Sequence, residues 1–188
     1  MSRPEKIDLF DLTDAVLEQL NVSGKFKLTH YDFNLKFSRD LSYPSDKLNI
    51  HLILFGQETA VTYYSTNYNT IPKIVNLLFV HLLDDGGFES IEHAICSTKR
   101  NHLEKLLSKT IEEINALLNA NELFNCSIFI DEQFPYGKVD EKGLPIHELN
   151  IYSEANNLDL KIDLNNQYFG VTEKQHVLEI VNSRISSL

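Results

Sequence analysis

Cysteine, methionine and tryptophan are scarce in this chain, whose 188 residues include two cysteines, one methionine and no tryptophan. Cys96 and Cys126 do not make the disulfide framework of a small secreted domain, and their pattern is typical of a reducing compartment. A chain of this length buries about 70% of its unfolded surface on folding. It therefore needs neither a disulfide nor a metal to be stable.

The sequence also lacks an apolar run long enough to cross a bilayer. The longest run, 71–83, carries Lys73, Asn76 and His81 and is too short for about 30 Å of hydrocarbon. Residues 1–14 are polar and acidic, unlike the apolar core of a signal peptide. We therefore expect a soluble, cytoplasmic protein with no membrane partner.

Basic residues are outnumbered, with 17 Lys and Arg against 27 Asp and Glu, which gives a formal net charge of −10. Non-specific nucleic-acid binders gain affinity by replacing counterions with Lys and Arg along the phosphate backbone. The longest basic run here is Lys99-Arg100, so direct nucleic-acid binding is disfavoured. A basic protein partner would instead be attracted, and its association would be accelerated.

Common sequence motifs of catalytic and cofactor-binding sites are absent as well. The seven glycines form neither G-x-G-x-x-G nor a P-loop, and the chain has no G-x-S-x-G, H-E-x-x-H or C-x-x-C. We therefore expect no cofactor and no catalytic site, although scattered residues can still assemble an active site without a motif.

What the sequence does contain is strong apolar periodicity of both helical and strand type. The clearest helical pattern is an apolar stripe in 98–119, made of Leu103, Leu106, Leu107, Ile111, Ile114, Leu117 and Leu118. Asn101 and Glu104 resemble a capping box for that helix, and 56–58 resembles a hairpin turn. The other predicted helices are 8–21, 71–83, 88–95 and 173–185, and the predicted strands are 25–33, 48–55, 59–65, 126–131, 148–152 and 158–164.

The order helix, three strands, helix occurs twice, and apolar positions recur at offsets of 101 to 103. The recurrence indicates either an internal repeat or a chance alignment of similar periods. If the repeat is real, 1–87 and 88–188 are tandem α-βββ-α units. In each unit an antiparallel meander packs against helices. The two units are either separate domains or parts of one compact domain. The predicted fold class is α+β. The matched residues are Leu9, Leu12 and Val16 with Ile111, Ile114 and Leu118; Phe26 and Leu28 with Ile128 and Ile130; Leu48 and Ile50 with Leu149 and Ile151; Val61 with Ile162; and Ile74, Leu77 and Leu78 with Val177, Ile180 and Val181.

One cluster contains residue types that bind metals: His81, Asp84, Asp85, His93, Cys96 and His102. His93 and Cys96 have a spacing that would place both on one helix face, where His102 could complete a zinc site. Cys96 fits better as a small buried residue beside Ala94 and Ile95, with the histidines on a polar face. We therefore predict no metal site.

Two segments have the composition of binding surfaces. The stretch 63–69 mixes tyrosine with serine, threonine and asparagine, which favours interfaces. The loop 133–146 carries aromatic and acidic residues and is longer than most connections in a compact domain. In the repeat alignment it matches 38–47. The predicted partner-binding residues are Tyr43, Tyr64, Tyr68, Phe134, Tyr136, Asp140 and Glu141.

These features favour a small acidic, non-catalytic protein, monomeric or homodimeric, that binds a basic protein partner. Within that class we expect an inhibitor or immunity-type antagonist, and a chaperone for a secreted protein is the alternative. From another class, a hydrolase or transferase could use Asp131, Glu132, His147 and Glu148, which approach each other if their strands pair antiparallel.

Overall fold

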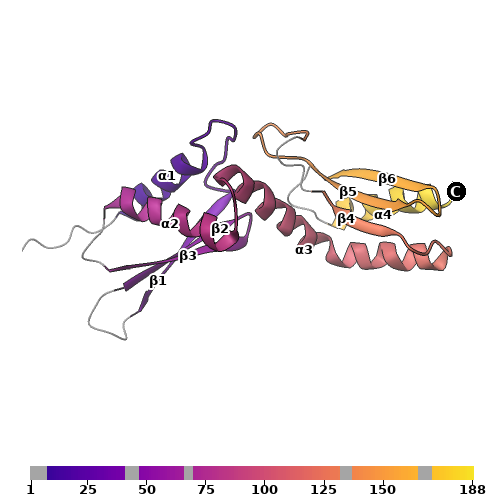
Figure 1. The fold of residues 1–188 in the computed structure, drawn as a ribbon, viewed down its shortest axis with the longest axis horizontal. Helices are drawn as coiled ribbons and strands as arrows, with labels where there is room; N and C mark the ends of the chain where they lie inside the picture. Colours follow the sequence, from indigo (N-terminus) through magenta and orange to yellow (C-terminus); the bar gives the residue numbers. More distant parts are fainter. Residues whose placement is uncertain (1–7, 41–46, 66–69, 132–136, 165–170) are drawn as a thin grey trace, which may run out of the picture. The chain divides into compact units, whose positions relative to one another are not determined.

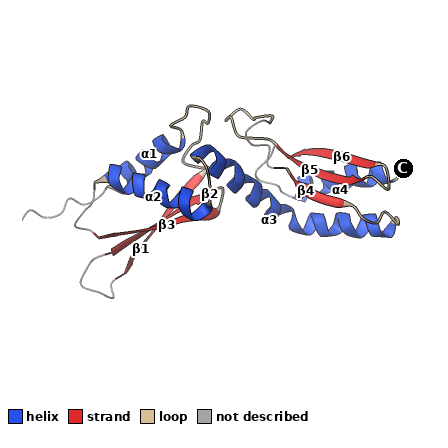
Figure 2. Cartoon of the chain, viewed as in Figure 1, coloured by secondary structure: helices blue, strands red, loops and turns tan. Residues whose placement is uncertain are grey.

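A computed structural model of the chain describes residues 8–40, 47–65, 70–131, 137–164 and 171–188 (Figure 1). The described part contains two three-stranded antiparallel sheets, each with its strands in sequence order, and this confirms the α+β class (Figure 2). None of its helices is long and apolar enough to cross a bilayer. The elements are α1 (Leu9–Leu20), β1 (Phe33–Asp40), β2 (Lys47–Leu54), β3 (Gln57–Ser65), α2 (Ile71–Gly86), α3 (Ile91–Ala120), β4 (Ser127–Ile130), β5 (His147–Ser153), β6 (Leu158–Leu164) and α4 (Val171–Ile185).

Packing divides the chain into two units, and the division falls inside α3. The first unit is Met1–Thr98 with Glu141–Leu144, and the second is Lys99–Asp140 with Pro145–Leu188. The first therefore includes a short segment from the loop between β4 and β5. The division of the sequence into repeats at 87/88 stays a prediction.

In the first unit, α1 and α2 lie on one side of the β1-β2-β3 sheet (Figure 1). Asp8 caps α1 by accepting a hydrogen bond from the Phe10 amide at 2.8 Å. The apolar residues of α1 recur every four positions, so that Leu12, Val16 and Leu20 are all buried on one face. The helix α2 buries Ile74, Val75, Leu78, Phe79 and Leu82.

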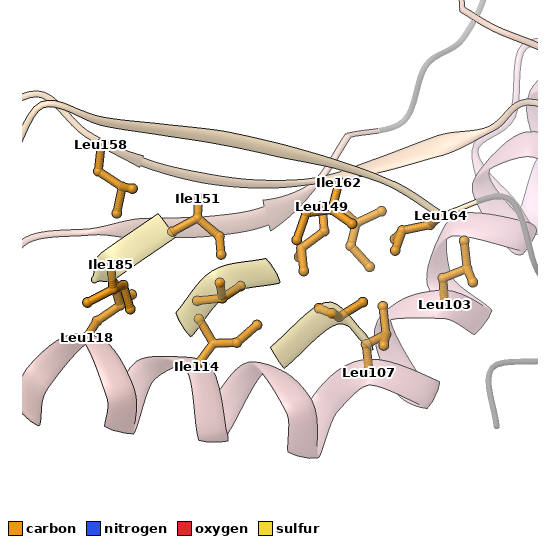
Figure 3. Packing of buried hydrophobic residues seen from close by; sticks show 13 residues of the cluster. Leu103, Leu107, Ile114, Leu118, Leu149, Ile151, Leu158, Ile162, Leu164 and Ile185 are labelled. Atoms are coloured by element: carbon orange, nitrogen blue, oxygen red, sulfur yellow. The ribbon is translucent and has the colours of Figure 1, made fainter. Parts of the chain in front are cut away.

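The second unit has an apolar core between its sheet and its two helices. The stripe predicted in α3 points at the β4-β5-β6 sheet, and α4 adds a row of its own to the same core (Figure 3). Full burial of each large aliphatic side chain stabilises the fold by about 1.5–3 kcal/mol. The core comprises Leu103, Leu107, Ile114, Leu118, Ile130, Leu149, Ile151, Leu158, Ile162, Leu164, Val177, Val181 and Ile185.

Both units have the predicted order of helix, three strands and helix. Most matched helix positions agree in burial, as Leu12 does with Ile114 and Ile74 with Val177. The matches at Leu9 and Leu77 do not agree, because both residues are exposed whereas Ile111 and Ile180 pack against the core. The third-strand match is wrong, because Val61 is exposed whereas Ile162 belongs to the core. A shift in register between Leu52 and Ile53 accompanies the change of face in the first sheet.

The first-strand match is also wrong, because 25–32 is a loop and β1 begins only at Phe33. Backbone groups that a strand would use bond elsewhere in this loop. The Asn21 side chain accepts from the Leu28 amide and donates to the Leu28 carbonyl, and Asp32 accepts from the Thr29 amide. Phe26 and Leu28 are nonetheless buried, so their apolar character reflects packing rather than strand pairing.

Three smaller predictions are corrected. The helices expected at 88–95 and 98–119 form one continuous helix, α3, so Asn101 cannot cap its start; the Ser90 hydroxyl instead accepts from the His93 amide. The β2-β3 hairpin turns at Phe55-Gly56, both with positive φ, which is a two-residue turn that matches strand twist. The apolar residues at 71–83 lie on nearly every side of the predicted helix, which indicates that most of it is buried, but α2 exposes Leu77 and Val80.

Candidate protein-binding surface

Most of the residues predicted to bind a partner lie outside the described residues. This holds for Tyr43, Tyr68, Phe134 and Tyr136. Tyr64 lies in β3, paired with Leu48 of β2, and its side chain is outside the described part. Their role in binding stays a prediction.

Asp140 has a structural contact of its own. Its carboxylate lies 3.6 Å from Lys99 Nζ, and the Lys99 side chain is only 1% exposed. The same ammonium donates to the Pro145 carbonyl at 2.7 Å. A buried ammonium needs such partners, because an unpaired charge away from water is costly. Replacing Asp140 would therefore disturb the fold as well as any interface, whereas Glu141 is exposed.

The next residues of this loop pack into the first unit. Lys142 Nζ donates to both carboxylate oxygens of Asp32, at 2.7 and 2.9 Å, and the Lys142 carbonyl accepts from the Lys27 amide at 2.8 Å. Gly143 has a φ of +77°, and a Cβ placed on it would lie 2.1 Å from the Lys25 carbonyl oxygen. Only glycine fits this approach. Segment 141–144 is therefore held by its backbone and by one buried charge pair.

The second sheet presents an open surface that the sequence did not identify. Side chains alternate between the two faces of a strand, and both helices of the unit pack on the core face (Figure 3). The opposite face, here called the outer face, is set by the strand registers. It consists of Ser127, Phe129, Glu148, Asn150, Tyr152, Asp159, Lys161 and Asp163.

One end of the outer face combines two aromatic rings with a carboxylate. Phe129 is 50% exposed and Tyr152 is 47% exposed. Phe129 pairs with Asn150 and Tyr152 pairs with Ser127, so the rings are diagonal neighbours on adjacent strands. Asp159 is directly opposite Tyr152 on the other side and is exposed. This end can bury apolar surface and accept a positive charge.

The other end is an ion-pair network. Lys138 Nζ lies 3.1 Å from Asp163 Oδ2 and 3.8 Å from Glu148 Oε1. The hydrogen bond to Asp163 is the main cause that raises the Lys138 pKa above its ordinary value, and the charges of Asp163 and Glu148 add to it. Lys138 thus partly neutralises the carboxylates of Glu148 and Asp163 at this end. The carboxylate of Asp159 lies at the opposite end of the outer face, beside the aromatic residues.

The outer face of the first sheet carries a polar cluster centred on Glu58. Glu58 lies between His51, 2.5 Å away, and Lys36, 3.7 Å away. The hydrogen bond to His51 is the main cause that lowers the Glu58 pKa, with smaller contributions from the charges of His51 and Lys36. Val61 is exposed on this face. Among the side chains that the structure describes on the two sheets, exposed aromatic residues occur on the second sheet only.

The residues of the possible hydrolase site are only partly brought together. The strands β4 and β5 pair antiparallel as expected, and His147 Nδ1 lies 2.8 Å from the Asp131 carbonyl oxygen. The His147 side chain is fully buried, however, while Glu148 lies on the outer face. Consecutive strand residues point to opposite faces, so the side chains of His147 and Glu148 are not brought together. Glu132 lies outside the described residues.

The metal-type cluster has other contacts. Cys96 is buried, as predicted, and the His81 ring lies 3.4 Å from the Asp85 carboxylate. The His93 ring packs edge-on against Phe88. Within the described ranges, no three His, Cys, Asp or Glu side chains are grouped so as to hold a metal ion.

Comparisons with known proteins add no relative. No family model matches the chain, no curated protein matches its sequence, and no solved structure matches its fold. The function proposed below is therefore inferred from the surface of the protein itself.

Proposed function

We propose that this protein binds a basic protein partner through the outer face of the second sheet, without catalysis of its own, and so inhibits or shields that partner. The observation that carries the proposal is the exposed pair Phe129 and Tyr152 beside the carboxylate of Asp159. Aromatic residues are enriched at protein interfaces because they bury a large area at little conformational cost.

The arrangement suits an arginine or lysine of the partner. A guanidinium can stack on the Tyr152 ring and pair with the Asp159 carboxylate at the same time. The formal charge of −10 adds a long-range field that attracts a basic surface and accelerates its association. An inhibitor or immunity-type antagonist of a basic enzyme would use both features.

Site-specific photo-crosslinking tests this proposal. A benzophenone amino acid is placed at Tyr152, at Phe129 and, as a matched control, at Phe10, an exposed aromatic residue on α1 of the other unit. In cells of the native source, the same basic protein should crosslink at positions 152 and 129 and not at position 10. Crosslinking at position 10 alone, or of an acidic protein at 152, would contradict the proposal.

A functional readout separates antagonism from mere contact. The crosslinked protein is purified and its own activity is measured with increasing amounts of the parent chain or of the Phe129→Ser, Tyr152→Ser double variant. The parent should suppress the activity at a stoichiometric ratio, and the variant should not. Unchanged activity at saturation would contradict inhibition.

A further inference from the structure

The second sheet has a free edge. The strand order β4-β5-β6 leaves β6 with a neighbour on one side only among the described residues. The Asp131 amide donates to the Glu148 carbonyl, so the backbone groups of Glu148 face β4. In an antiparallel ladder the facing alternates along each strand. Glu148 pairs with Asp163, so the backbone groups of Asp163 face away from β5. Every second residue of β6 faces the same way, so the backbone N–H and C=O groups of Asp159, Lys161 and Asp163 all point away from β5.

A groove lies alongside this edge. It has a volume of about 510 Å³, and β6 is the strand that lines it, through Leu160, while α4 supplies the other wall. Ile180 of α4 gives the groove a second apolar residue, and its other lining residues, all polar or charged, are His176, Glu179, Ser183, Arg184 and Ser187. Side chains of a strand added to β6 would point alternately into this groove and onto the outer face.

We propose that the edge of β6 and the groove between β6 and α4 bind an extended segment of the partner by strand addition. In this mode of recognition, backbone hydrogen bonds supply affinity and alternate side-chain positions supply specificity. The segment carries a basic side chain opposite Asp159, and its alternating apolar side chains lie over Leu160 and Ile180. The inference rests on the proposed function only for the basic character of the segment.

The charges on β6 favour a foreign segment over a second copy of the chain. An antiparallel pairing of two β6 strands that uses all seven residues would place Lys161 opposite Lys161 and Asp159 opposite Asp163. Like charges directly opposite are destabilising. A register shifted by two residues would pair Asp with Lys but would shorten the ladder. A segment with lysine or arginine opposite Asp159 has no such conflict.

A synthetic peptide tests the edge directly. The probe is a fluorescent peptide of sequence Lys-Val-Ser-Val-Lys. This sequence is palindromic, so it presents the same side chains to β6 in a parallel or an antiparallel orientation. The matched control has the same side chains but carries an N-methyl group on each of its five amides, so that it can donate no backbone hydrogen bond to β6 in either strand direction. We expect saturable binding of the first peptide in fluorescence anisotropy and none of the second.

A proline on the edge provides the test from the protein side. Lys161→Pro removes an outward N–H, and proline is tolerated on edge strands, so the fold should persist. Loss of one backbone hydrogen bond should weaken peptide binding about fivefold or more, whereas Lys161→Ala should change it less than about twofold. If Lys161→Pro fails to fold, the N-methylated peptide still decides the question on the parent chain.

Three results would overturn the inference: no saturable binding of the unmodified peptide, equal binding of the N-methylated peptide, or a dimer in light scattering that Lys161→Pro dissolves. The Phe129→Ser, Tyr152→Ser variant keeps the β6 edge and should bind the peptide like the parent. If the unmodified peptide does not bind, but partner binding still needs Phe129 and Tyr152, only the inference of strand addition to β6 is wrong. If the peptide binds as described, but the partner binds the Phe129→Ser, Tyr152→Ser variant as well as the parent, only the proposed function is wrong.

Discussion

Lys142 Nζ lies 2.7 Å from Asp32 Oδ1, although 110 positions separate the two residues in the sequence. The Asp32 side chain is fully buried and also accepts from the amide and the hydroxyl of Thr29. The pair therefore holds segment 141–144 in the first unit. It also pairs one positive with one negative charge, so that the two add little net charge to the field that a partner meets.

Removing Lys142 should destabilise the protein. Lys142→Met leaves the buried Asp32 carboxylate without this charged donor, and the loss of a hydrogen bond to a charged group costs roughly 1.5–3 kcal/mol. Lys109→Met, on the exposed side of α3, is the control and should change the free energy of unfolding by less than about 0.5 kcal/mol. Urea unfolding measures both. Equal effects would show that the Lys142 contact contributes nothing.

Two glycines with positive φ provide a matched pair. Gly143→Ala and Gly87→Ala both place a Cβ on a left-handed residue, which costs about 1–2 kcal/mol. The Cβ at Gly87 meets open space, whereas the one at Gly143 meets the Lys25 backbone, so only the second also forces the loop to move. Gly143→Ala should therefore lower the thermal unfolding midpoint more than Gly87→Ala does. The reverse order would contradict the packing of 141–144.

The stripe of α3 should dominate the stability of the second unit. Leu107→Ala and Ile114→Ala each remove a fully buried side chain and should cost about 2–5 kcal/mol. Glu113→Ala, next to Ile114 and exposed, should stay within about 0.5 kcal/mol of the parent. Chemical denaturation followed by circular dichroism gives these values. Costs near zero at Leu107 and Ile114 would mean that the stripe does not form the core.

Glu58 should titrate below its ordinary pKa of 4.5, because His51 and Lys36 favour its charged form. A group whose pKa is lowered by folding contributes stability above its unfolded pKa and loses it as the pH falls through the folded value. The contribution is thus present at neutral pH and disappears in acid. NMR titration of the Glu58 carboxyl carbon measures the pKa, which should rise in His51→Ala. An unchanged pKa in that variant would contradict the contact.

The helices and most strands were predictable because their apolar periods are regular. Leu12 and Val16 lie one turn apart and are both buried, and β6 has the predicted bounds of 158–164. Local periodicity reports which face of an element is buried. It does so without knowledge of the partner element.

The failures have a common physical cause, which is that contacts from outside the predicted run decided the structure. The run 25–33 reads as a strand, but the side chain of Asn21 and the backbone of Lys142 take its hydrogen bonds. Apolar residues occupy consecutive positions at 128–130, so alternation alone could not place Phe129 on the outer face. The antiparallel register that brings it near Tyr152 was the missing information.

The most direct test of the proposed function is the dissociation rate of the complex with the crosslinked partner, measured by surface plasmon resonance. Phe129→Ser and Tyr152→Ser should each raise the dissociation rate, because desolvated aromatic residues hold a complex together once it has formed. Glu141→Lys should mainly slow association, and the difference should shrink as the Debye length falls from about 10 Å at 0.1 M salt to about 3 Å at 1 M. Dissociation rates equal to the parent's in both serine variants would contradict the account.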